Sequence, residues 1–232
     1  MKLAVIPARG GSKRIPRKNI RNFCGKPVIA YSIETALQSG LFDEVVVSTD
    51  DDEIADIARQ HGASIPFMRP AQLADDFTGT NAIVKHAVEW FQQHADRPEY
   101  ACCIYATAPL LLPEFIQQGF DKLRQHDCAY AFSVSHYDFP VQRALRMRDD
   151  GLLDALYPEH INARSQDLED AWHDAGQFYW GKAQAFIDEI PMMAGHAVGI
   201  PLPRYRVQDI DTEEDWRQAE LMYQALTSAS CK

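Results

Sequence analysis

Residues 3–19 read L-A-V-I-P-A-R-G-G-S-K-R-I-P-R-K-N. An apolar run closed by Pro7 is typical of a short buried strand, and a charged loop that contains two glycines follows it at once. In open sheets of parallel strands, ligands bind beyond the carboxyl ends of the strands. This stretch therefore predicts a first strand that delivers a ligand-binding loop to the edge of an α/β sheet.

Outward from this loop, strand-like and helix-like segments alternate along the chain. Predicted strands cover residues 3–7, 44–49, 64–68, 100–106, 129–135, 176–180 and 197–201. Predicted helices cover residues 27–40, 50–61, 80–93, 113–125 and 212–226. This alternation predicts an α/β fold with a mostly parallel sheet and right-handed crossovers.

Residues 136–170 break this pattern. They carry scattered charge, a hairpin-like turn at 149–151 and little hydrophobic periodicity. We interpret residues 1–232 as a single domain, and residues 136–170 as an insertion or a dimerisation arm within it. A homodimer is the expected assembly.

The charge distribution restricts the class of ligand. Six basic residues and no acidic residue lie between Arg9 and Arg21, although the whole chain carries a net charge of -10. The rest of the chain therefore sets 17 basic residues against 33 acidic ones. An acidic chain with one cationic loop lacks the extended basic surface of a nucleic-acid binder. The loop instead predicts binding of one small polyanion.

Several other classes of protein are excluded or disfavoured by missing patterns. The sequence has neither G-x-x-x-x-G-K-[ST] nor G-x-G-x-x-G, so P-loop NTPases and dinucleotide-binding folds are not indicated. The eight histidines lack the spacing of a zinc enzyme, the five cysteines lack a C-x-x-C pair, and no G-x-S-x-G hydrolase motif occurs. No apolar stretch is long enough for a membrane span. We expect a cytoplasmic enzyme.

The cationic loop has the chemistry of a phosphate-binding loop. Gly10 and Gly11 allow the backbone to approach phosphate oxygens closely, while Arg9, Lys13 and Lys18 supply positive charge. The alternative is a solvated surface loop. The paired glycines directly after the first strand favour phosphate binding.

Asp209-Ile210-Asp211 is a candidate metal site. In an extended segment, side chains two residues apart point to the same side, so both carboxylates can face one ligand. Mg²⁺ prefers one or two carboxylates plus substrate phosphate oxygens. The alternative is that Asp211 supports the next helix and Asp209 pairs with Arg204 or Arg206.

Several motifs, read in order, carry a family resemblance. They are I-P-A-R-G-G-S-K at 6–13, P-x-K-N at 16–19, S-T-D at 48–50, R-P-A-x-L-A-D-D at 69–76 and D-I-D at 209–211. This set resembles the sugar nucleotidyltransferases that make CMP-activated acidic sugars, and in particular the CMP-sialic acid synthetase (acylneuraminate cytidylyltransferase) branch. The resemblance implies a three-layer, Rossmann-like nucleotidyltransferase fold.

The resemblance also implies roles for individual residues. The residues implied in CTP binding are Ala8, Arg9, Gly10, Gly11, Ser12, Lys13, Asn19 and Arg69. The implied catalytic residues are Arg9, Lys13, Lys18 and Asp211, with Mg²⁺ held by Asp209 and Asp211. The candidates for binding the sugar are Tyr105, Thr107, Arg164, Gln177 and Tyr179. Among these, an arginine fork suits a carboxylate, and strand alternation predicts that Gln177 and Tyr179 share a face opposite Phe178.

The implied reaction is transfer of CMP from CTP to the anomeric hydroxyl of a nine-carbon 2-keto acid sugar, with release of pyrophosphate. Within this branch, five motifs resemble those of enzymes that use pseudaminic acid: S-K-R-I-P-R-K-N at 12–19, Y-A-T-A-P at 105–109, R-S-Q-D-L-E at 164–169, H-D-A-G-Q-F-Y-W at 173–180 and R-Y-R-V-Q-D-I-D at 204–211. Legionaminic and N-acetylneuraminic acid are the alternatives. An alternative of another class is a nucleotide-binding regulator without turnover. The chain departs from the sialic-acid pattern at Arg14 and Arg17, which replace glycines, and at Tyr105, which replaces glutamine. Triphosphate binding alone does not explain the two extra arginines.

Overall fold

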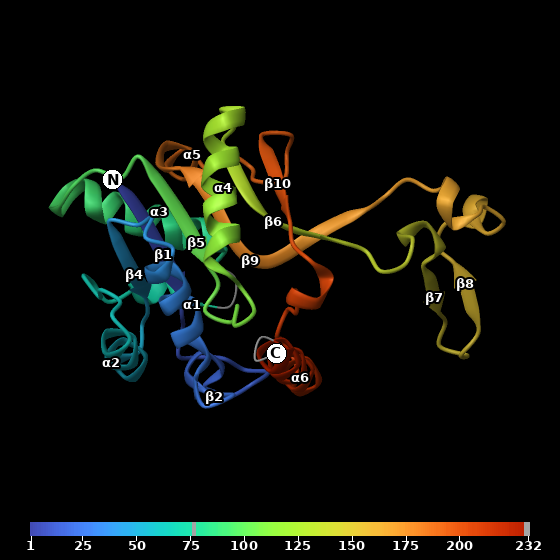
Figure 1. Cartoon of the computed structure of the whole chain (residues 1–232), viewed down its shortest axis with the longest axis horizontal. Coiled ribbons are helices and arrows are strands. Elements are labelled where there is room, and N and C mark those ends of the chain that lie inside the picture. The colour runs from blue at the N-terminus through green and yellow to red at the C-terminus, as the bar shows by residue number, and fades with distance from the viewer. Residues whose placement is uncertain (76–77, 230–232) are drawn as a thin grey trace.

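The computed structural model describes residues 1–75 and 78–229. Its main sheet consists of β1 (Lys2–Pro7), β4 (Glu44–Ser48), β5 (Tyr100–Ile104), β6 (Tyr130–His136), β9 (Trp172–Lys182) and β10 (Ala197–Pro201). These strands lie in the order β10-β6-β9-β5-β1-β4 (Figure 1). β1 pairs in parallel with β4 and β5, and β10 pairs in parallel with β6, whereas β9 runs antiparallel between β5 and β6. The predicted mostly parallel sheet is confirmed.

Helices cover both faces of this sheet. They are α1 (Val28–Gln38), α2 (Asp52–Gln60), α3 (Thr80–His94), α4 (Pro113–His126) and α5 (Ala183–Ile187), whereas α6 (Glu213–Ala229) packs outside these layers. Alternation along β1 sends Ala4 and Ile6 into a core with α1, α2 and α4, while Leu3 and Val5 face a second core with α3 and α5. The predicted three-layer α/β architecture is therefore confirmed.

Two predicted strands differ in the structure. Residues 64–68 do not form a strand, because only Ser64 bridges to Val46 and Pro66 has no N–H to continue a ladder. The strand expected at 176–180 begins earlier, at Trp172, and runs antiparallel to both its neighbours. Gly176, with a φ of 63°, lies where the β6–β9 register shifts, and it allows the strand to continue through this irregularity.

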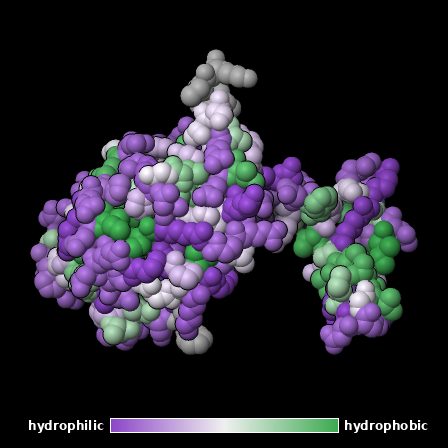
Figure 2. Space-filling view, turned by 90° about the horizontal axis from the view of Figure 1, so that it is seen from below, coloured by the Kyte–Doolittle hydropathy of each residue, from purple (hydrophilic) through white to green (hydrophobic). Residues whose placement is uncertain are grey.

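The segment between β6 and β9 leaves the body of the molecule as an arm (Figure 1). It contains the hairpin of β7 (Leu145–Met147) and β8 (Leu153–Ala155), with Gly151 at a φ of 81° in the predicted turn. Large apolar side chains are exposed on it, including Phe139, Met147 and Ile161. Figure 2 shows these apolar patches standing apart from the body.

A third core joins the cationic loop to α6. Ile15 from the loop packs with Phe23 of β2 (Asn22–Phe23) and with Ile210 and Trp216 from the C-terminal region. The Phe23 and Trp216 rings meet edge to face with centroids 5.5 Å apart. This core holds both ends of the predicted site close together.

Thr212 and Asp215 form a capping box at the start of α6. The Thr212 N–H donates to Asp215 Oδ2 at 2.8 Å, and the Asp215 N–H donates to Thr212 Oγ1 at 3.2 Å.

Within residues 1–75 and 78–229, none of the helices has the length and apolarity that a membrane crossing requires.

Candidate active site

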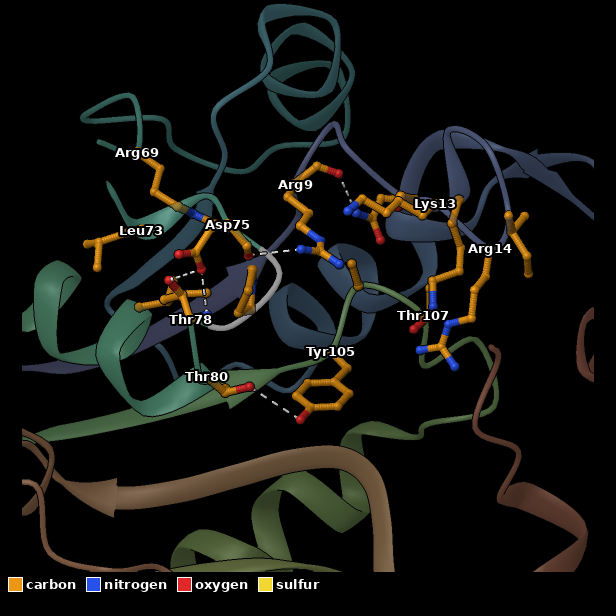
Figure 3. Close-up of a pocket in the computed structure, with 17 residues that line it drawn as sticks. Arg9, Lys13, Arg14, Arg69, Leu73, Asp75, Thr78, Thr80, Tyr105 and Thr107 are labelled. Atoms are coloured by element: carbon orange, nitrogen blue, oxygen red, sulfur yellow. Dashed lines mark hydrogen bonds between the residues drawn. The ribbon is translucent and has the colours of Figure 1, made fainter. Parts of the chain in front are cut away.

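A cleft of about 310 Å³ opens beyond the carboxyl ends of β1 and β5 (Figure 3). Its lining includes these predicted site residues: Arg9, Ser12, Lys13, Lys18, Asn19, Arg69, Tyr105 and Thr107. They come from the loop after β1, from the segment before α3, and from the end of β5. The fold thus brings most of the predicted CTP-binding residues and two of the sugar-binding candidates into one cavity, at the sheet edge where ligands of this architecture bind.

Gly10 packs directly against the start of α2. A Cβ atom at this position would lie 2.6 Å from Asp51 Oδ2 and 3.0 Å from Asp51 Cβ. The Gly10 N–H donates to Asp50 Oδ1 at 3.1 Å, so Gly10 serves the close approach of the loop to α2. Gly11, by contrast, has no heavy atom within 4 Å of a Cβ position. Ala8, Gly10 and Gly11, which were expected to bind CTP, are not among the residues that line the cleft.

Positive charge dominates the described lining of the cleft. Arg9, Lys13, Arg14, Lys18 and Arg69 are basic, whereas Asp75 is the one acidic residue in this set. Such a concentration of cations in a concave site attracts a polyphosphate.

The backbone and neighbouring side chains position these cations. Arg9 donates to the Asp75 carbonyl at 2.9 Å, and the Asn19 side chain donates to the Arg9 carbonyl at 3.0 Å. Arg69 is only 5% exposed and donates to the Ser48 hydroxyl at 3.1 Å and to the Ser48 carbonyl. Burial lowers the pKa of Arg69 to about 10, so this side chain is still charged at neutral pH.

The Asp211 carboxylate meets two cations of the loop. Lys18 Nζ lies 3.3 Å from Asp211 Oδ1 and donates to the Ile210 carbonyl at 2.5 Å. Arg14 pairs with Asp211 Oδ2 at 2.9 Å. Because Lys18 and Arg14 line the cleft, Asp211 lies at its border rather than within its lining.

The structure does not contain the alternative roles considered for Asp209 and Asp211, namely pairing with Arg204 or Arg206 and support of the next helix. Asp215, not Asp211, accepts the N–H groups at the start of α6. Arg204 pairs with Asp138 at 2.5 Å, and Arg206 donates to the Leu110 carbonyl at 3.4 Å. Burial, and to a lesser extent the nearby charge of Asp211, raise the pKa of Asp209.

Asp209 and Asp211 are candidate ligands for a divalent cation beside the cleft. Among residues 1–75 and 78–229, no group of three or more His, Cys, Asp or Glu side chains is arranged to hold a metal. Mg²⁺ is commonly bound by one or two carboxylates and completed by substrate phosphates and water. Asp209 and Asp211 beside a cationic cleft match that requirement.

Tyr105 and Thr107 occupy the far wall of the cleft (Figure 3). The Tyr105 hydroxyl and Thr80 Oγ1 are 3.3 Å apart, and burial raises the pKa of Tyr105. Tyr179 lies behind Tyr105 with ring centroids 5.2 Å apart, and it donates to Asp174 Oδ2 at 2.6 Å. Both aromatic rings are therefore held in place before any ligand binds.

The other two sugar candidates lie elsewhere. Gln177 is 2% exposed, and its amide group donates to the Arg206 carbonyl, while its Oε1 has no hydrogen-bond partner in the described structure. Arg164 lies on the arm, away from the cleft, and pairs with Asp167 at 2.7 Å. As predicted, Tyr179 and Phe178 face opposite sides of the sheet.

Some lining residues were not predicted from the sequence. Leu73, Asp75, Thr78, Thr80 and Ile83 form the wall between Arg69 and α3. Leu73 and Asp75 belong to the motif at 69–76 that also contains Arg69, whereas Thr78, Thr80 and Ile83 follow it in the sequence. Asp76 of that motif lies outside the described residues.

A cationic glycine loop after the first strand of a mostly parallel sheet, beside a carboxylate pair, defines a Rossmann-like enzyme of the nucleotidyltransferase class. The chain belongs to the cytidylyltransferase family, whose family model matches residues 3–201. This membership confirms the class implied by the sequence motifs.

Individual relatives agree with the family. The chain is 44% identical over 221 residues to a pseudaminic acid cytidylyltransferase of Campylobacter jejuni, covering 95% of both chains. It is 44% identical over 119 residues to a CMP-N,N'-diacetyllegionaminic acid synthase of Legionella pneumophila, covering 51% of each. A solved CMP:2-keto-3-deoxy-manno-octonic acid synthetase complexed with CTP superimposes with a TM-score of 0.68 at 18% identity, covering 97% of this chain and 99% of that one. The last comparison supports the fold.

Proposed function

We propose that the chain transfers CMP from CTP to the anomeric hydroxyl of pseudaminic acid, giving CMP-pseudaminic acid and pyrophosphate. The observation that carries this proposal is the cluster of five cations in a cleft, two of which, Arg14 and Lys18, pair with Asp211 at its border. The 44% identity over 95% of the chain to an enzyme of that name supports the choice of sugar.

Charge stabilisation by the loop is the main catalytic contribution of the protein. In phosphoryl and nucleotidyl transfer, catalysis depends on positioning and on neutralising charge as the leaving group departs. Arg9 and Lys13 neutralise the leaving pyrophosphate, and Ser12 donates a hydrogen bond to a phosphate oxygen. Lys18, held by the Ile210 carbonyl, stabilises charge where the loop meets Asp211. No side chain of the cleft is assigned as a general base.

Asp209 and Asp211 hold Mg²⁺ in this proposal. When bound there, the ion would supply positive charge beside the phosphates and the attacking hydroxyl. Arg14 and Lys18 pair with Asp211 and compensate its charge.

Tyr105 and Thr107 contact the sugar from the far wall of the cleft, with Tyr179 supporting Tyr105. Legionaminic acid is the second candidate substrate, because the chain matches half of a CMP-N,N'-diacetyllegionaminic acid synthase at 44% identity. N-acetylneuraminic acid ranks lower, because Tyr105 stands where the sialic-acid pattern has glutamine. A regulator without turnover is disfavoured by the presence of Arg9, Lys13, Asp209 and Asp211.

The arm mediates a homodimer in this proposal, because its exposed apolar side chains suit burial against a second copy. The arm extends away from the body of the molecule (Figure 1), and Arg164 on this arm is not among the residues that line the cleft of its own chain, so we assign it to the cleft of the partner subunit. A cytoplasmic location follows from the use of CTP. No nucleic-acid partner is proposed for this acidic chain.

The substrate is tested by competition. Purified enzyme receives CTP, Mg²⁺ and equal concentrations of pseudaminic, legionaminic and N-acetylneuraminic acid, and mass spectrometry identifies each CMP-sugar. We expect CMP-pseudaminic acid to exceed the other products at least tenfold. Preference for another sugar would reject the substrate, and no product from any sugar would reject the enzyme in favour of the regulator.

A further inference from the structure

Arg17 adopts a backbone conformation that arginine rarely takes. Its φ is 55° and its ψ is 29°, in the left-handed region where glycine is favoured. The related sialic-acid pattern has glycine at this position. This chain therefore keeps a backbone suited to glycine and adds a long cationic side chain to it.

The side chain of Arg17 ties the loop to α2. Arg17 Nη1 lies 2.5 Å from Asp51 Oδ2 and Nη2 lies 3.0 Å from Asp51 Oδ1, a bidentate contact, and Nη2 also contacts Glu53. Asp51 Oδ1 at the same time accepts the Ile54 N–H at 3.0 Å and caps α2. Gly10 packs against the same side chain, with its Cβ position 2.6 Å from Asp51 Oδ2. One carboxylate thus joins two points of the loop to a helix.

The residues directly after Arg17 line the cleft. The Arg17 carbonyl accepts the N–H groups of Ile20 at 3.1 Å and Arg21 at 3.0 Å, forming the 3₁₀ turn Lys18–Ile20. From this turn, Lys18 reaches Ile210 and Asp211, and Asn19 donates to the Arg9 carbonyl. The position of Arg17 therefore determines where two residues of the cleft stand.

We propose that Arg17 is a positioning residue for CTP: its contacts with Asp51 and Glu53 lock the turn that carries Lys18 and Asn19 onto α2. This inference rests on the proposed function for its ligand. Arg17 does not line the cleft and acts through Lys18 and Asn19. Removing its side chain lets the turn move, so CTP binding weakens while the sugar side of the cleft is unaffected.

Arg17→Gly is the sharpest variant, because glycine suits the left-handed backbone and only the side-chain contacts are lost. We expect the Kd of CTP, measured calorimetrically with Mg²⁺ and without sugar, to rise five- to twentyfold. The KM of CTP should rise similarly, and the KM of the sugar at saturating CTP should stay within twofold. Amide hydrogen exchange in residues 18–21 should accelerate by a similar factor.

Two further variants complete the test. Asp51→Asn keeps a helix cap but loses the charge, so it should weaken CTP binding, and adding it to Arg17→Gly should cost little more. Arg59→Ala is the control, since Arg59 pairs with Asp56 on the exposed side of α2 at 2.8 Å and makes no described contact with the loop. It should leave CTP binding unchanged.

CTP affinity within twofold of wild type in Arg17→Gly would overturn the proposal, as would fully multiplicative losses in the double variant. Failure of the wild-type enzyme to turn over any sugar would reject the proposed function instead. The calorimetric and exchange measurements need no sugar, so they test the positioning role in either case.

Discussion

Lys18 Nζ lies 3.3 Å from Asp211 Oδ1, although 193 positions separate the two residues in the chain. The contact joins the loop after the first strand to the segment before the last helix. Arg14 occupies the other carboxylate oxygen of Asp211 at 2.9 Å. Asp211 is therefore the ion-pair partner of Arg14, just as Asp51 and Glu53 are the partners of Arg17. Triphosphate binding alone did not explain Arg14 and Arg17. Both side chains pair with acidic residues outside the loop, which gives each of them a structural role.

Replacing Lys18 tests the contribution of this cation to catalysis. Lys18→Met keeps the aliphatic stem and removes the charge, so kcat/KM should fall about 100- to 1000-fold, the range for losing one pre-positioned electrostatic group. Steady-state pyrophosphate release measures the effect. Lys122→Met is the matched control, because Lys122 lies exposed on α4, where its described contact is with Gln125. A loss below threefold in Lys18→Met would remove Lys18 from the catalytic residues.

Asp211→Asn tests the metal site. The substitution keeps the shape of the side chain and removes its charge, so Mg²⁺-dependent turnover should fall at least 100-fold. The melting temperature should change little, since Asp211 makes surface ion pairs that contribute about 0–1 kcal/mol each. Mn²⁺ binding in the presence of CTP, followed by electron paramagnetic resonance, should weaken in parallel. Near-normal turnover would exclude Asp211 as a metal ligand.

The two neighbouring glycines should differ sharply. Gly10→Ala places a methyl group 2.6 Å from Asp51 Oδ2, so the loop or α2 must shift, and we expect a loss of about 1–3 kcal/mol in the free energy of unfolding. Gly11→Ala meets no atom within 4 Å and should change the free energy of unfolding by less than about 0.5 kcal/mol. Chemical denaturation of both variants measures the difference. Equal stability losses would contradict the packing of Gly10 on Asp51.

Subunit mixing tests the proposed dimer and the place of Arg164. An Arg164→Ala chain and an Asp211→Asn chain should each be nearly inactive alone. In a mixed dimer, the intact cleft of the first chain receives the intact arm of the second, so activity should recover to about a quarter of wild type when equal amounts are mixed and re-equilibrated. Sedimentation shows whether dimers form. Mixed dimers without recovered activity would show that Arg164 does not serve the partner's cleft.

The periodic parts of the fold were predictable because their hydrophobic pattern is local. The apolar run of β1 and the apolar face of α3 follow directly from the order of residues. The antiparallel direction of β9 was not predictable, since its partners β5 and β6 are distant in sequence and the arm precedes it. The failed strand at 64–68 shows the same limit, because one bridge at Ser64 satisfies the sheet and Pro66 ends it.

The site was predictable to the extent that ordered motifs carry it. Arg9, Lys13, Arg69 and Tyr105 meet in one cleft as expected, because parallel strands end at a shared edge. The contacts of Arg17 with Asp51 depend on the left-handed backbone conformation of Arg17, which the residue pattern of this chain does not predict. The proposed role of Arg164 depends on the direction in which the arm extends, which is set by tertiary structure and assembly and not by local sequence.

The most direct test of the central claim is pyrophosphate release from CTP by the purified wild-type enzyme with Mg²⁺, with and without pseudaminic acid. Release should depend on the sugar, and one CMP-pseudaminic acid should form for each pyrophosphate. Omitting Mg²⁺ should reduce the rate to background. Sugar-independent release, or no release with any nine-carbon 2-keto acid sugar, would contradict the claim that this cleft catalyses CMP transfer.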